Sequence, residues 1–111
     1  MTKNIQIDGK KIESWDAFHT CFCETFGFPE FYGRNMNAWI DCMTSLDAPD
    51  EGMSLIHVEK GDVLVLCISG TDILKKRSKD IYDALVECSA FVNYRRIKTG
   101  LQAVLALSFE G

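Results

Sequence analysis

The segment from Phe31 to Asp41 combines aromatic, amide and carboxylate side chains at spacings that suit the binding of a cationic group. Asn37 and Asp41 are four residues apart, so a helix would place both side chains on one face. Phe31 and Tyr32 come just before that helix. A carboxylate held beside rigid aromatic side chains is typical of binding hot spots. The segment therefore predicts a binding surface centred on Asp41, rather than a catalytic centre.

A loop followed by a short helix must position these side chains. Pro29 and Gly33 bracket the loop, and Asn35 is a suitable N-cap because its side-chain oxygen can accept from the free amides of the first turn. We expect the helix to begin at about residue 36. Its apolar residues recur at three- and four-residue steps and predict one buried stripe. The stripe consists of Met36, Trp39, Ile40 and Met43.

The residues that enzymes of this size use for catalysis do not form a recognisable pattern. The sequence contains no GxSxG, HExxH, GxGxxG or P-loop motif, and its two histidines, His19 and His57, are far apart. Cys42 follows Asp41 directly, but adjacent residues on a helix face different directions, so we interpret Cys42 as a packing residue. We expect no catalytic residues, no cofactor and no enzymatic activity.

The cysteines predict reduced thiols. Their number is odd, so they cannot all pair in disulfides. Cys21 and Cys23 are two residues apart on an expected helix and therefore point to different sides, which does not suit a metal site. We expect mostly buried free thiols and no metal. The five are Cys21, Cys23, Cys42, Cys67 and Cys88.

The formal net charge of -4 is unevenly distributed. Residues 30–62 contain seven acidic and two basic residues, so the acidity accompanies Asp41, and an acidic face attracts cationic partners. Residues 75–98 contain seven basic and three acidic residues. These basic residues form two clusters without interleaved aromatic residues, so they predict a solvated helix surface and no nucleic-acid partner.

The length of 111 residues and the apolar content of 47% fit one globular domain over residues 1–111. No apolar run approaches the roughly 20 residues of a membrane-spanning helix. The N-terminus lacks the apolar core of a signal peptide. We therefore expect no membrane partner and a cytoplasmic location.

The first helix should carry an aromatic face. A strand is expected at residues 5–7, and Ser14 is a suitable N-cap for a helix that ends at Gly27. Four aromatic residues keep helical spacing on this helix and predict core packing. They are Trp15, Phe18, Phe22 and Phe26.

In the second half of the chain, strands are expected to alternate with helices. The apolar run 63–68 predicts a strand covered on both faces, and such alternation predicts an α/β fold with parallel strands. Ile81, Leu85, Cys88 and either Phe91 or Val92 should face the core. The other expected elements are a surface loop at 45–52, a short extended piece at 55–58, a brief helix capped by Thr71 and extending to Lys76, a longer helix capped by Ser78, and a strand at 103–107.

The motif around Asp41 resembles that of the barstar family of ribonuclease inhibitors. The resemblance covers most of the chain and is most specific at Pro29, Glu30, Phe31, Tyr32, Gly33, Asn35, Ala38, Asp41, Cys42 and Thr44. It implies a two-layer α/β fold in which a small parallel sheet, of about three strands, packs with helices.

The resemblance also implies a function. The loop and helix 29–46 would block the active site of a ribonuclease or another toxin protein, and Asp41 would take the place of an RNA phosphate. The protein would act as an intracellular immunity protein that is monomeric when free. The implied partner-binding residues are Phe31, Tyr32, Asn35, Asn37, Ile40, Asp41, Thr44 and Ser45.

Some positions depart from the family pattern. Phe31, Asn37 and Ile40 stand where the best-known inhibitor has a tyrosine, an aspartate and a tryptophan, and Arg34 replaces an acidic residue. These changes leave open a second hypothesis, a regulatory adaptor that binds another cellular protein through the same face. A small enzyme or ligand-binding domain is a third, less supported hypothesis.

Overall fold

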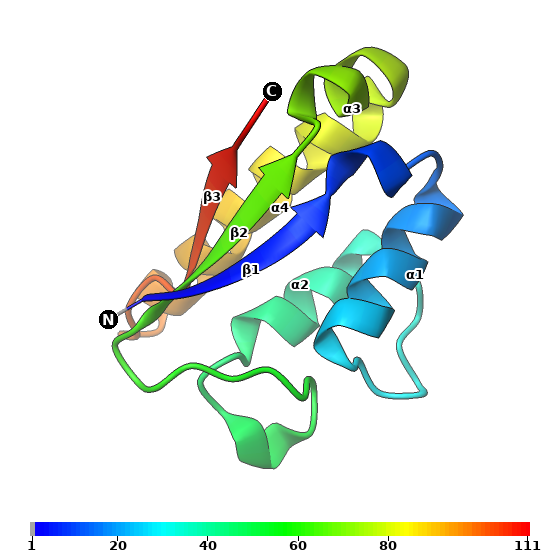
Figure 1. The fold of residues 1–111 in the computed structure, drawn as a ribbon. Coiled ribbons are helices and arrows are strands. Elements are labelled where there is room, and N and C mark those ends of the chain that lie inside the picture. The colour runs from blue at the N-terminus through cyan, green and yellow to red at the C-terminus, as the bar shows by residue number, and fades with distance from the viewer. Residues whose placement is uncertain (1) are drawn as a thin grey trace.

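The computed structural model describes residues 2–111. It contains a parallel sheet whose strands are connected along the chain by helices (Figure 1). In chain order the elements are β1 (Thr2–Asp8), the 3-10 turn η1 (Gly9–Lys11), α1 (Trp15–Phe26), α2 (Met36–Thr44), the 3-10 turn η2 (Pro49–Glu51), β2 (Val63–Ser69), α3 (Thr71–Arg77), α4 (Lys79–Lys98) and β3 (Leu105–Phe109). This mixed α/β architecture confirms the predicted fold class.

The three strands lie in the order β1-β2-β3, and both pairs are parallel. Parallel neighbours need a crossover, which α1 and α2 supply between β1 and β2, and α3 and α4 supply between β2 and β3. At the centre of the sheet Leu66 is paired with Ile5 on one side and Leu107 on the other.

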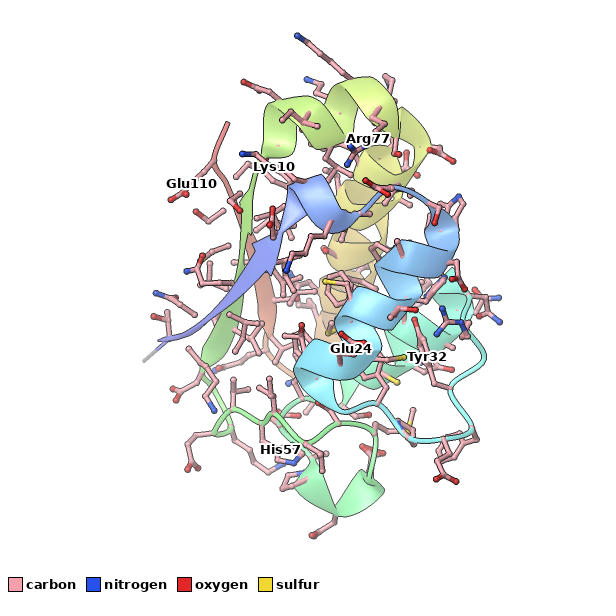
Figure 2. The ribbon with its side chains drawn as sticks, turned by 45° about the vertical axis from the view of Figure 1, so that its right-hand side comes forward. Lys10, Glu24, Tyr32, His57, Arg77 and Glu110 are labelled. Atoms are coloured by element: carbon pink, nitrogen blue, oxygen red, sulfur yellow. The ribbon has the colours of Figure 1, made fainter. Side chains whose placement is uncertain are left out.

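Among residues 2–111, the helices α1, α2 and α4 cover one face of this sheet, and no helix covers the other (Figures 1 and 2). On β2, Leu64, Leu66 and Ile68 are buried, whereas the alternating residues Val63 and Val65 are only partly buried. The prediction that β2 is covered on both faces was wrong, because a two-layer fold supplies helices for only one of them.

The core joins the aromatic face of α1 to α2. Phe18, Phe22 and Phe26 are fully buried, and the Trp39 ring lies 6.3 Å from that of Phe18 and 5.7 Å from that of Phe22. Core packing is confirmed for these residues. Trp15 is exposed instead, and its indole N–H donates to Asp80 at 3.0 Å.

Two element starts differ from the sequence-based expectation. Thr71 does not cap α3: Gly70 precedes the helix in a left-handed conformation, and the Thr71 hydroxyl donates to the Ile68 carbonyl at 2.8 Å. β3 begins at Leu105 rather than at residue 103. The Asn93 side chain accepts from the backbone amides of Val104 and Leu105, so a side chain holds the start of the strand.

Other boundaries need smaller corrections. α4 follows Ser78 as expected, but the Ser78 side chain makes no capping bond. Residues 55–58 form no strand. On α4, Ile81, Leu85 and Val92 are buried while Phe91 is exposed, which resolves the open choice in favour of Val92. Within residues 2–111 no helix combines the length and apolarity that crossing a membrane requires.

Candidate functional site

The loop before α2 is anchored through Tyr32. The Tyr32 ring packs 4.7 Å from that of Phe28, and its hydroxyl lies 2.6 Å from His19 Nδ1 on α1. Tyr32 is only 8% exposed, while the neighbouring Phe31 is 74% exposed. The anchor therefore turns Phe31 outward.

The pKa values of His19 and Tyr32 indicate the charge state of this pair. Burial, and then the positive charge of Arg34, lower the pKa of His19, so the imidazole is neutral at neutral pH. Burial raises the pKa of Tyr32, so its hydroxyl keeps its proton. The hydrogen bond therefore joins two neutral groups, and the pair carries no charge in the core.

Arg34 fixes the same loop to the outside of α1. Its backbone has a left-handed φ of 52°, which is unusual for a residue with a side chain. Its Nη2 donates to the Asp16 carbonyl, the Asp16 carboxylate and the Thr20 hydroxyl at 2.8 to 2.9 Å. The ion pair with Asp16 balances the Arg34 charge on the α1 side of the loop.

Asn35 caps α2 as the sequence predicts. Its Oδ1 accepts from the Ala38 amide at 2.8 Å, and its backbone is extended. Once α2 begins at Met36, Trp39 and Met43 turn into the core. Asn37 and Asp41 consequently lie on the exposed side of the helix.

The structure divides the predicted partner-binding residues by exposure. Phe31, Asn35, Asn37 and Asp41 are exposed, and Thr44 and Ser45 are partly buried. Tyr32 and Ile40 are each 8% exposed and pack mainly into the core beneath this surface, although Tyr32 also lines a hollow beside Asp41. Contact of these two side chains with a partner stays a prediction.

Asp41 is paired with a residue that the sequence did not connect to it. Its Oδ1 accepts from Arg95 Nη1 on α4 at 2.9 Å, with side chains that are 55% and 42% exposed respectively. The basic end of α4 therefore packs beside the acidic surface of α2. The expected acidic face is partly neutralised, because Arg95 offsets part of the negative charge of Asp41.

Arg96 fixes the C-terminal end of α2. Its Nη1 and Nη2 donate to the two carboxylate oxygens of Asp47 at 2.9 and 2.7 Å, Nη1 also donates to the Thr44 carbonyl, and Nε donates to the Gln102 carbonyl. The hydrogen bonds from Arg96 hold the pKa of Asp47 below its usual value. A solvated surface was the wrong prediction for Arg96. Its place four residues after Val92, on the buried stripe of α4, was the available signal.

Two hollows flank Asp41. One, of about 330 Å³, is lined by Phe31, Asn35 and Asn37 among others. The second, of about 630 Å³, lies towards α4 and is lined by Thr44, Ser45, Arg95 and Leu101 among others. Asp41 lines both hollows, so its carboxylate lies between two concave parts of the surface, one beside the loop and one beside α4.

One of the five cysteines, Cys42, lies on α2 directly after Asp41. All five cysteines are unpaired with one another, and burial, followed by the charge of Asp41, raises the pKa of Cys42 to about 11. A thiol with that pKa stays protonated and is a poor nucleophile. Among residues 2–111, no three histidine, cysteine or acidic side chains gather to hold a metal ion.

Comparison with known proteins places this surface in context. The model of the family described as "Barstar (barnase inhibitor)" matches residues 2–106. The chain is also similar to a Bacillus subtilis (strain 168) protein named "Putative ribonuclease inhibitor YrdF", with 38% identity over 48 residues. That match covers 42% of this chain and 53% of the relative, so the chain spans about half of the relative's length.

Proposed function

Since this chain belongs to the barstar family, we propose that it inhibits a ribonuclease or a related toxin by binding it through residues 29–46. The observation that carries the proposal is the exposure of Asp41 and Asn37 beside Phe31, on a helix whose opposite face is locked into the core. The proposed binding surface consists of Phe31, Asn35, Asn37, Asp41, Thr44 and Ser45, with Tyr32 and Ile40 supporting it from within.

Asp41 would act as a substitute for an RNA phosphate. The cationic side chains of a ribonuclease active site bind phosphate oxygens, and a carboxylate offers them the same charge and similar acceptors. Only Oδ1 of Asp41 is used in its bond with Arg95, so Oδ2 is available to a partner. An inhibitor held at this position prevents RNA from entering. The protein would serve as a cytoplasmic immunity protein, monomeric when free, in a bacterial cell that makes the nuclease.

A second candidate keeps the surface and changes the partner. In this version the chain is a regulatory adaptor that binds another cellular protein. The ion pair between Asp41 and Arg95 favours it, because the pair reduces the negative charge that a cationic nuclease site would meet.

A titration of ribonuclease activity tests the inhibitor proposal. The secreted proteins of the source organism are assayed with a fluorogenic RNA while the purified chain is added. The wild-type chain should remove activity at stoichiometric amounts. Asp41→Ala should raise the inhibition constant at least about 30-fold, because losing a desolvated charged partner costs about 2 kcal/mol or more.

Asp83→Ala is the matched control, because Asp83 is also a helical aspartate in an exposed ion pair. It lies near the N-terminal end of α4, whereas Arg95, the partner of Asp41, lies near the C-terminal end. It should inhibit as well as the wild type does. If the wild-type chain inhibits no ribonuclease activity, the inhibitor proposal is wrong. If Asp41→Ala inhibits fully, the surface is wrongly assigned. Asp41-dependent capture of a protein that is not a nuclease would support the adaptor.

A further inference from the structure

The position of Arg95 beside Asp41 is set by the backbone and not only by their ion pair. The next residue, Arg96, is 3% exposed and donates to the Thr44 carbonyl at the end of α2 and to Asp47 just after it. These bonds join α4 to α2 directly below the surface. A partner that reaches Asp41 therefore meets Arg95 as well, whether or not their side chains stay paired.

Both members of this pair keep unused hydrogen-bonding groups. Among the interactions of residues 2–111, the bond from Arg95 Nη1 to Asp41 Oδ1 accounts for one donor and one acceptor. Arg95 retains donors at Nη2 and Nε, and Asp41 retains its second oxygen. The hollow of about 630 Å³ beside them gives a partner side chain room to enter, and its other charged lining residues are two acidic and two basic ones, Asp47, Glu51, Lys60 and Arg96.

We propose that Arg95 is a specificity-determining residue of the partner-binding surface and that it binds an acidic side chain of the partner. The inference rests on the proposed function and adds the chemistry of the target. The nuclease or toxin would present a carboxylate to Arg95 next to the basic group that meets Asp41. A target with basic groups alone would be disfavoured.

The chemistry of the guanidinium supports a carboxylate as the occupant. A guanidinium binds a carboxylate through two parallel N–H bonds, and the unused Nη2 and Nε atoms suit such a pair. A purely basic target would place like charges against Arg95 in a surface from which water is excluded, which reduces affinity. Alternating charges on both partners avoid this cost and fix the register of the complex.

The competing explanation is that Arg95 only occupies Asp41 until a cationic partner displaces it. The two accounts predict opposite results for Arg95→Gln. Removing a competitor would strengthen inhibition, whereas removing a partner contact would weaken it. Arg95→Lys separates charge from geometry, because lysine keeps the positive charge but cannot make the two parallel bonds.

The experiment measures half-inhibitory concentrations for wild type, Arg95→Gln, Arg95→Lys, Arg95→Glu and Asp41→Ala. The probes are the ribonuclease activity secreted by the source organism and, in parallel, purified barnase. For any probe that the wild type inhibits, Arg95→Gln should raise the half-inhibitory concentration at least tenfold. Arg95→Lys should raise it less than Arg95→Gln does, and Arg95→Glu should raise it most. Lys79→Gln, which removes another exposed basic partner of an aspartate on α4, should stay within twofold of wild type.

A rescue identifies the partner residue. Acidic residues of the inhibited nuclease are changed one at a time to lysine, and one of these changes should restore inhibition by Arg95→Glu. Unchanged or stronger inhibition by Arg95→Gln, in a variant with wild-type circular dichroism, would overturn the inference while leaving the inhibitor proposal intact. Full inhibition by Asp41→Ala would instead overturn the proposed surface. A wild-type chain that inhibits neither probe would overturn both proposals.

Discussion

Arg96 and Asp47 form a two-bond ion pair in which the side chains are only 3% and 8% exposed. The pair joins α4 to the loop that follows α2, and the remaining donors of Arg96 bind the carbonyls of Thr44 and Gln102. Arg96, which the sequence predicts to lie on a solvated surface, is thus buried and connects α4 to this loop. It sets the position of α2 and therefore the shape of the proposed binding surface.

Replacing Arg96 should destabilise the fold strongly. Arg96→Met leaves Asp47 buried without its partner, and breaking a buried pair in this way costs about 3–5 kcal/mol. The free energy of unfolding from urea titration measures the effect. Lys79→Gln, which breaks an exposed pair, should change it by less than about 1 kcal/mol. If Arg96→Met lowered the free energy of unfolding by no more than Lys79→Gln does, the pair would not support the fold.

The same pair predicts a loss of stability in acid. The hydrogen bonds from Arg96 lower the pKa of Asp47 in the folded chain below the usual value of 3.8. The unfolded chain then binds a proton more readily, so this contribution is present above pH 3.8 and is lost as the pH falls through the folded-state pKa. Free energies of unfolding from pH 7 down to pH 2 should fall more for wild type than for Asp47→Asn. Equal pH profiles would rule out this contribution.

The neighbours Phe31 and Tyr32 should have opposite mutational effects. Phe31 is exposed, so Phe31→Ala should weaken inhibition while changing the free energy of unfolding by less than about 0.5 kcal/mol. Tyr32→Phe leaves His19 Nδ1 buried without its hydrogen-bonding partner and should cost about 1–3 kcal/mol of stability. Urea titration measures the free energy of unfolding of each variant, and the ribonuclease assay measures its inhibition. A stability loss for Phe31→Ala that matches that of Tyr32→Phe would contradict this division.

Asn35 should contribute to binding partly through the helix that it caps. Asn35→Ala removes the acceptor of the Ala38 amide and should cost about 0.5–2 kcal/mol of stability. Asn35→Asp keeps the cap, because a carboxylate accepts the same bond, and should remain close to wild type in urea titration. If both substitutions destabilise the chain equally, the cap is not the source of the effect.

Local features of the fold could be read from the sequence because short-range contacts determine them. Ser14 and Asn35 cap α1 and α2, each by accepting from an amide three residues later. Gly27 ends α1 with a left-handed φ of 66°, which a glycine adopts without strain. The aromatic spacing of α1 placed Phe18 and Phe22 in the core. Each of these features depends on a few adjacent residues or on helical periodicity.

The starts of α3 and β3 were less predictable, because side chains from elsewhere compete for the backbone. The Thr71 hydroxyl donates to Ile68 instead of capping the helix, and Asn93 from α4 takes the amides of Val104 and Leu105. A propensity rule applied along the chain does not contain these partners. The errors therefore occur where an element begins, and not in its type.

The sequence by itself determined the family motif, the helix that presents Asp41 and the residues that face inward from that helix. Only the tertiary structure decided which charges meet. Arg95 is 54 residues from Asp41, and Arg96 is 49 residues from Asp47, yet both pairs are in contact. Coulomb interactions depend on separation in space, and a count of charges along the chain does not contain that separation. The count therefore predicted an acidic surface and a solvated basic helix as two separate features. The packing of α4 against α2 brought these charges together and gave the proposed binding surface both signs.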